Sequence, residues 1–113
     1  MIIMNLTNNK ILARHAWVAD SFFTRLKGLL GKDRLLTGEA LVIRPCNSVH
    51  TFGMRYAIDV IFADADHRVV KLVSCLGPGK MAGCLAGRYV VELPAGTLAL
   101  DGTAVGHSLR IGE

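Results

Sequence analysis

The stretch from Cys46 to Phe62 places four chemically versatile side chains in an otherwise apolar run that is typical of a β-strand. They are the thiol of Cys46, the imidazole of His50, the guanidinium of Arg55 and the carboxylate of Asp59. Polar groups that are buried in such a run are either hydrogen-bonded or used in function. We therefore expect the functional site of this protein to lie in this stretch.

Nucleophilic catalysis by a thiol is one chemistry that these residue types could support. It requires a base within hydrogen-bond distance and a third group that orients the base, and Cys46, His50 and Asp59 are of the required types. Four residues of extended strand separate Cys46 from His50 by about 13 Å, so their side chains meet only if the chain folds back between them. A buried cysteine that behaves as a small hydrophobic residue is the more common alternative.

Two acidic residues interrupt apolar, strand-like runs. Asp59 lies within Ile58–Phe62, and Glu92 lies within Tyr89–Leu93. A carboxylate at such a position needs donors from basic side chains or backbone amides. The two carboxylates could act as acid and base, or each could anchor a turn or an arginine, and the sequence leaves both alternatives open.

A metal site is disfavoured by the spacing of the possible ligands. Zinc would have to be bound by residues far apart in the chain, such as Cys46, His50, Cys75 and Cys84. Structural zinc sites are typically built from ligand pairs a few residues apart, and the sequence contains no C-x-x-C or H-x-x-x-H pair. The segment Asp64–His67 also lacks the glycine and the closing glutamate of a calcium loop. We predict no metal site and no cofactor.

The elements that position these residues begin with a hairpin and a helix. Two short apolar runs flank Asn8-Asn9, which predicts an opening hairpin. Asp20 is the expected N-cap and Gly31 the expected stop of an amphipathic helix that contains Gly28. The side chains predicted to face the core from this helix are Phe22, Phe23, Leu26, Leu29 and Leu30.

Beyond Glu39 the pattern changes to short runs rich in Val and Ile, separated by Gly, Pro and Asp, which is typical of strands. We predict strands at about 40–44, 49–52, 58–63, 69–76, 89–93 and 108–111. Gly77–Gly87 is rich in glycine and predicts a long surface loop, and residues 94–102 suggest a short helical turn. The predicted fold class is mainly β (α+β): a compact, small barrel-like or sandwich-like sheet of about six to eight short strands with one main amphipathic helix.

Length and composition set the remaining bounds. The chain has 113 residues, of which 51% are hydrophobic, and this predicts a single globular domain over residues 1–113. A formal net charge of +4 without one strongly basic face argues against nucleic acid as a partner. No apolar run is long enough to span a bilayer, and Met1–Asn5 is unlike a secretory signal. Three irregularly spaced cysteines suit a reducing compartment, so we expect a cytoplasmic protein with free thiols.

Four segments carry a resemblance to a known family: Arg25–Gly31, Pro45–Arg55, Ile58–Phe62 and Glu92–Thr97. With these motifs in this order and spacing, the chain from about residue 13 to residue 111 resembles the uncharacterised prokaryotic family called domain of unknown function 192. The resemblance implies a compact, mainly β single domain with one helix, and it implies no particular activity. Members of that family often carry an export signal ahead of the domain, whereas this sequence starts almost directly at the domain, in line with a cytoplasmic location.

Two functions fit these observations. The favoured hypothesis is a small ligand-binding or accessory module with a cleft between the Ser48–Arg55 segment and the Gly77–Gly87 loop, and its partner would be a small molecule or a protein. The predicted binding residues are Ser48, His50, Thr51, Phe52, Met54, Arg55 and Asp59. The alternative is a small hydrolase-like enzyme that uses His50 with Asp59 or Cys46, and this requires those side chains to converge within about 3 Å.

Overall fold

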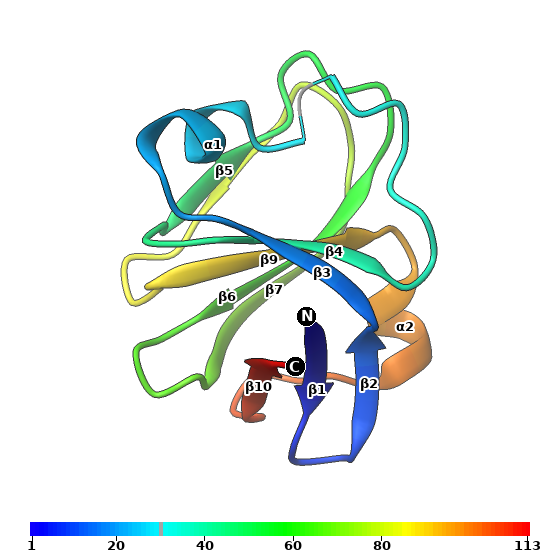
Figure 1. The fold of residues 1–113 in the computed structure, drawn as a ribbon, viewed down its shortest axis with the longest axis vertical. Helices are drawn as coiled ribbons and strands as arrows, with labels where there is room; N and C mark the ends of the chain where they lie inside the picture. Colours follow the sequence, from blue (N-terminus) through cyan, green and yellow to red (C-terminus); the bar gives the residue numbers. More distant parts are fainter. Residues whose placement is uncertain (30) are drawn as a thin grey trace.

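The fold is mainly β, with a five-stranded sheet at its centre (Figure 1). The computed structural model describes residues 1–29 and 31–113, without the side chains of Phe22, Phe23 and Leu26. This part of the chain forms ten strands in three sheets and two short helices, and none of the three sheets closes into a barrel. The mainly β class is confirmed. The prediction of six to eight strands and of a barrel-like shape is wrong, because short strands pair into separate sheets.

The central sheet has the strand order β3-β4-β9-β6-β7. Its strands are β3 (His15–Ala19), β4 (Glu39–Ile43), β9 (Tyr89–Pro94), β6 (Ile58–Ala63) and β7 (Val69–Leu76). The first pair, β3 and β4, runs parallel, and the other neighbours run antiparallel. All six residues of β6 are buried, and so are the first five of β9, because both faces of the sheet are covered. Coverage of both faces explains why these strands are apolar at successive positions, apart from Asp59 and Glu92.

The central sheet separates two hydrophobic cores, and alternation along each strand sends successive side chains to opposite cores. Ile61 of β6 and Val91 of β9 belong to the first core. Val60 and Val90, their neighbours in the same strands, belong to the second core. A residue's place in the alternation therefore decides which core its side chain enters.

A three-stranded sheet and a short helix cover the first core. The sheet has the order β10-β1-β2, formed by Leu109–Gly112, Ile2–Asn5 and Lys10–Ala13, and the helix α2 spans Thr97–Asp101. The pairing of β1 with β2 confirms the predicted opening hairpin. The predicted helical turn after β9 is confirmed as α2. The two chain ends lie side by side because β1 pairs with β10 (Figure 1).

The second core is covered by helix α1 (Phe22–Lys27) and by a two-stranded sheet of β5 (Ser48–His50) and β8 (Met81–Gly83) (Figure 1). The N-cap of α1 is Ser21 rather than Asp20, because Ser21 and Thr24 form a reciprocal capping box. The helix ends at Gly28, whose φ of 51° only glycine adopts readily, so the predicted stop at Gly31 is wrong.

Of the apolar stripe predicted for this helix, Leu29 is buried, with 4% of its surface exposed. The side chains of Phe22, Phe23 and Leu26, and the whole of Leu30, lie outside the described residues.

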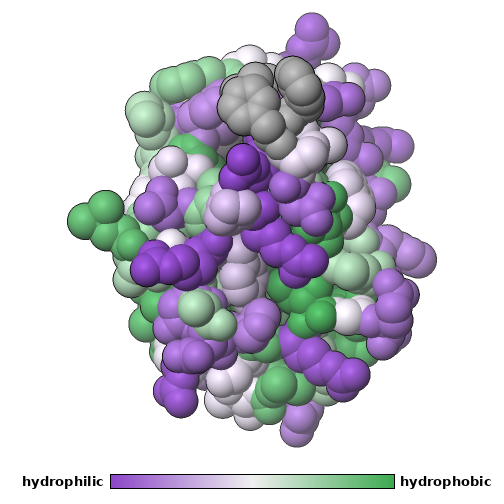
Figure 2. Space-filling model, turned by 60° about the vertical axis from the view of Figure 1, so that its left-hand side comes forward, coloured by the Kyte–Doolittle hydropathy of each residue, from purple (hydrophilic) through white to green (hydrophobic). Residues whose placement is uncertain are grey.

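On the face shown in Figure 2, hydrophobic residues occur in small groups that are separated by hydrophilic ones. No helix within residues 1–29 and 31–113 has the length and apolar character that crossing a membrane would require.

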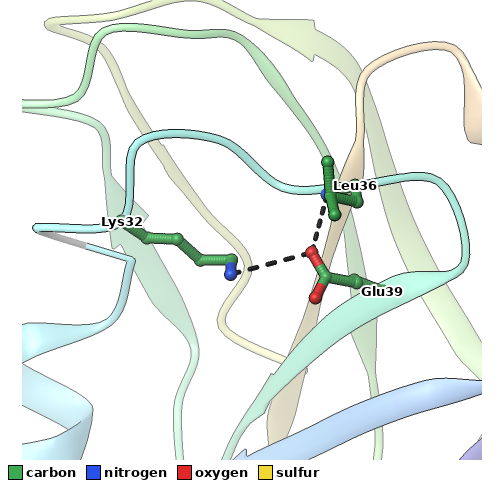
Figure 3. A network of polar contacts seen from close by, with 3 residues as sticks. All are labelled: Lys32, Leu36 and Glu39. Carbon is green, nitrogen blue, oxygen red and sulfur yellow. Dashed lines mark hydrogen bonds and ion pairs between the residues drawn. The ribbon is translucent and has the colours of Figure 1, made fainter.

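Glu39 stabilises the connection between α1 and β4. One carboxylate oxygen, Oε1, accepts a hydrogen bond of 2.8 Å from the backbone N–H of Leu36 and lies 3.7 Å from Nζ of Lys32 (Figure 3). The same ammonium lies 5.0 Å from the centre of the Trp17 ring on β3. The connection is therefore attached to β4 through Glu39 and to β3 through the contact between Lys32 and Trp17.

Candidate functional site

A cavity of about 100 Å³ lies in the second core, between α1, the central sheet and β5. The central sheet contributes Ile43 of β4 and Glu92 of β9 to its wall. The other lining residues are Arg25, Lys27, Gly28, Leu29, Cys46, Ser48, Val49, His50 and Met54. We call this cavity the Glu92 pocket.

The Glu92 pocket brings together three of the four segments that carry the family resemblance. Arg25–Gly31 contributes the α1 side, Pro45–Arg55 contributes the β5 side, and Glu92–Thr97 contributes Glu92 itself. The fourth segment, Ile58–Phe62, is the strand β6 next to β9, and its residue Val60 pairs with Glu92. Segments that are far apart in the sequence thus meet at one cavity.

Glu92 is the most unusual residue of the pocket. Only 3% of its surface is exposed, and within the described part of the chain no hydrogen-bond or ion-pair partner reaches its carboxylate. Burial raises the pKa of Glu92 from 4.5 to about 7, because the ionised form loses its hydration. A carboxylate with this pKa changes charge near neutral pH.

Two further titratable groups lie close enough to sense the charge of Glu92. Burial, followed by this charge, raises the pKa of the Tyr56 phenol, and the Tyr56 hydroxyl is buried without a partner among the described residues. Burial also raises the pKa of the Cys46 thiol, and the charge of Glu92 adds to that effect. The Cys46 thiol donates a hydrogen bond of 3.0 Å to the backbone oxygen of Ser48. Burial therefore favours the neutral forms of Glu92, Cys46 and Tyr56.

His50 lies at the exposed side of the pocket. Its ring stacks on the ring of Phe52, with 5.2 Å between the ring centres and 24° between the planes. Phe52 is 49% exposed and is not among the pocket-lining residues. A flat aromatic pair of this kind adds apolar surface beside the cavity.

Asp59 lies away from His50 in the fold, on the other face of the central sheet. It is completely buried, and its alternation in β6 sends it to the first core, on the opposite face of the sheet. Its Oδ1 accepts a hydrogen bond of 2.8 Å from the backbone N–H of Cys75, at an irregularity in β7 where the φ of Cys75 is 53°. Its Oδ2 accepts hydrogen bonds from the N–H groups of Gly96 (3.1 Å) and Leu98 (2.9 Å), which begin α2.

The contacts of Asp59 correct two of the sequence-based alternatives. A hydrolase that pairs His50 with Asp59 is not formed, because the sheet lies between the two side chains. Asp59 and Glu92 also face opposite cores, so they do not form an acid and base pair. The physical reason is that Asp59 satisfies three backbone donors in the first core.

The predicted cleft between Ser48–Arg55 and Gly77–Gly87 is likewise corrected. Within the second segment Met81–Gly83 forms β8 and pairs with β5, so the two segments form one sheet instead of bordering a cleft. Thr51 is fully buried in this arrangement, and its hydroxyl donates to the backbone oxygen of Gly77 (2.6 Å) and accepts from the N–H of Lys80 (2.9 Å). Backbone pairing and these hydrogen bonds order the segment that the sequence indicated as a loop.

Of the seven predicted binding residues, Ser48, His50 and Met54 line the Glu92 pocket. The other four, Thr51, Phe52, Arg55 and Asp59, are not among its lining residues. The prediction omitted Arg25, Lys27 and Glu92. The signal for Glu92 was present, since it interrupts an apolar strand, whereas nothing local in the sequence indicated that α1 would lie over it.

Of the residues considered as zinc ligands, Cys46 and His50 line the Glu92 pocket, whereas Cys75 and Cys84 do not. Among the described residues, no three side chains of His, Cys, Asp or Glu converge in a group that could hold a metal ion.

The three cysteines are free, and they should differ in reactivity. We expect iodoacetamide at pH 8 to alkylate Cys75, which is exposed, before Cys46, because burial suppresses the thiolate of Cys46. Peptide mass spectrometry over a time course would measure both rates. Faster alkylation of Cys46 than of Cys75 would contradict the raised pKa and would favour a nucleophilic role for Cys46.

Solved structures share this fold. A protein of unknown function from Novosphingobium aromaticivorans has a TM-score of 0.83 and 18% identity, with 97% of this chain and 82% of that chain covered. A second solved structure, from Sinorhizobium meliloti, has a TM-score of 0.81 and 16% identity, with 96% and 89% covered. At these identities the likeness concerns the fold alone.

Relatives in sequence carry the family designation UPF0127. One from Pyrococcus furiosus is 34% identical over 112 residues, which cover 96% of this chain and 96% of the relative. One from Pyrococcus horikoshii is 36% identical over 99 residues, with 84% of this chain and 85% of the relative covered. Residues 3–111 match the profile of domain of unknown function 192, described as "Uncharacterized ACR, COG1430". The chain therefore belongs to this uncharacterised family.

Proposed function

We propose that this protein is a small-molecule-binding module whose ligand occupies the Glu92 pocket. The observation that carries the proposal is the carboxylate of Glu92, which is buried at a cavity without a partner in the described part of the chain. An ionisable group that is largely buried beside a cavity is costly to ionise, and such groups are found where a ligand or a reaction uses them. The apolar wall with a few converging polar groups is also typical of ligand sites.

The remaining form of the hydrolase hypothesis would use Cys46 with His50. Both residues line the pocket, but burial raises the pKa of the Cys46 thiol, and this effect outweighs the lowering by the hydrogen bond to Ser48 and by the charge of Arg25. An activated cysteine needs the opposite, a pKa that is lowered by a nearby cation or an adjacent base. The environment of Cys46 therefore favours binding over nucleophilic catalysis.

A small molecule is a better match for the pocket than a large protein partner. The cavity is compact, at about 100 Å³, and hydrophobic residues on the face in Figure 2 form only small groups. Stable protein interfaces usually rest on larger continuous patches. We further propose that the protein works in a reducing compartment such as the cytoplasm, which the three free cysteines support.

The proposal predicts a ligand-dependent thermal shift that requires His50. A metabolite present at a hundred times its dissociation constant should add about 2.7 kcal/mol to the free energy of unfolding. This corresponds to an increase of roughly 10 °C in melting temperature. Because His50 is exposed, His50→Ala should leave the melting temperature of the free protein nearly unchanged while reducing the shift. A metabolite screen by thermal denaturation measures both quantities.

The matched control is His15→Ala, because His15 is an exposed histidine on β3 that does not line the pocket. It should retain the full ligand shift. The proposal would be wrong if no class of small molecule stabilises the protein, or if both histidine variants respond alike.

A further inference from the structure

The Glu92 pocket has opposite charges on its two sides. Glu92 lies on the central sheet, whereas Arg25 and Lys27 lie in the last turn of α1 across the cavity. The guanidinium of Arg25 is held by hydrogen bonds to the backbone oxygens of Pro45 (3.1 Å) and Ser21 (3.4 Å). Within the described residues neither cation forms an ion pair with Glu92, so the charges stay separated.

This separation restricts the ligand. An anion alone would meet Arg25 and Lys27 but would be repelled by ionised Glu92. A cation alone would satisfy Glu92 but would leave the α1 side without a partner. A molecule that carries both charges a few bonds apart can satisfy the two sides together, and charged hydrogen bonds in a partly dry cavity are strong.

We propose that the Glu92 pocket binds a small zwitterion of the α-amino-acid class, with its ammonium group at Glu92 and its carboxylate at Arg25 and Lys27. The assignment rests on the proposed function as a small-molecule binder. The size of the cavity, about 100 Å³, limits the side chain of the ligand to a few atoms, as in glycine, alanine or serine. Arg25 is suited to the carboxylate because its planar guanidinium can donate two parallel hydrogen bonds.

The titratable and charged groups that face Glu92 are Arg25 and Lys27 from α1, Cys46 and Tyr56 from the connections around β5, and His50 from β5. Binding of an ammonium group requires Glu92 to be ionised, and the pKa of Glu92 in the empty pocket is about 7. The affinity should therefore rise about tenfold between pH 6 and pH 8, as a proton leaves Glu92.

Matched ligands test the two charges separately by isothermal titration calorimetry. L-alanine carries both charges, L-alaninamide keeps only the ammonium, and N-acetyl-L-alanine keeps only the carboxylate. We expect glycine, L-alanine or L-serine to bind, and both single-charge analogues of L-alanine to bind at least about tenfold more weakly. Equal binding of L-alanine and either analogue would overturn the zwitterion assignment.

Paired variants connect each charge to its residue. Glu92→Gln should remove both binding and its pH dependence, and Arg25→Gln should reduce the preference for L-alanine over L-alaninamide. Glu113→Gln and Arg110→Gln, which make the same chemical changes at exposed positions outside the pocket, should change neither. Thermal denaturation of all four variants checks that they fold.

The outcomes separate this inference from the proposed function. If a neutral metabolite shifts the melting temperature and Glu92→Gln abolishes that shift, while the three amino acids do not bind, the pocket is a ligand site and the zwitterion assignment is wrong. If neither the metabolite screen nor the amino acids give a response, both proposals are wrong.

Discussion

Asp59→Ala is expected to destabilise the protein by about 3 kcal/mol, because three backbone donors would lose their acceptor, at about 1 kcal/mol for each of the two partly buried ones and more for the buried one. Those donors are the N–H groups of Cys75, Gly96 and Leu98. They belong to β7 and to the start of α2, so the variant should loosen both elements together. Equilibrium unfolding in urea measures the loss.

Asp66→Ala is the matched control, since Asp66 is an exposed residue of the turn between β6 and β7. Its free energy of unfolding should differ from that of the wild type by no more than about 0.5 kcal/mol, as for most surface substitutions. If Asp59→Ala cost no more than Asp66→Ala, the carboxylate of Asp59 would not be the acceptor that holds β7 and α2 to β6.

Glu92→Gln is expected to stabilise the free protein at alkaline pH. The folded-state pKa of Glu92, about 7, lies above its ordinary value of 4.5, so the folded state holds this proton more tightly than the unfolded chain does. The resulting stabilisation is complete below about pH 4.5 and is lost as the pH rises through 7. Glutamine stays neutral, so at pH 8.5 the variant should exceed the wild type by about 3 kcal/mol in unfolding free energy.

Chemical denaturation of both proteins from pH 4.5 to pH 8.5 tests the direction of this pH dependence. The difference between variant and wild type should be near zero at the acid end and should grow with pH. Glu113→Gln, at an exposed residue, should follow the wild type throughout. A difference that does not depend on pH would mean that Glu92 is already paired in the free protein.

The strands that sequence patterns identified are those with strong, local signals. The six strands predicted beyond Glu39 correspond to β4, β5, β6, β7, β9 and β10, and the polar Asn8-Asn9 turn to the β1–β2 hairpin. β3, His15–Ala19, was missed because two of its five residues are alanines, which favour strands weakly. Its place in the sheet comes from parallel pairing with β4, which is a long-range contact.

The candidate site was only partly predictable for a similar reason. The segment around Ser48 and His50 stood out locally, and it does border the pocket. The sequence could not assign Asp59 and Glu92 to opposite faces, because the register of β6 against β9 decides this and no local pattern encodes it. Within the predicted loop, Met81–Gly83 forms β8, which no local pattern indicated because its partner, β5, lies about 30 residues earlier in the chain.

The pairing of β1 with β10 determines when the first core can be completed during folding. Ile2 lies opposite Gly112, so this contact closes a loop of nearly the whole chain, and closing it carries a large entropic cost. On a ribosome, the residues of β1 emerge before those of β10 and must wait for them to pair. We therefore expect the half of the molecule around the Glu92 pocket to take shape earlier, and the β10-β1-β2 sheet to assemble in the last folding step.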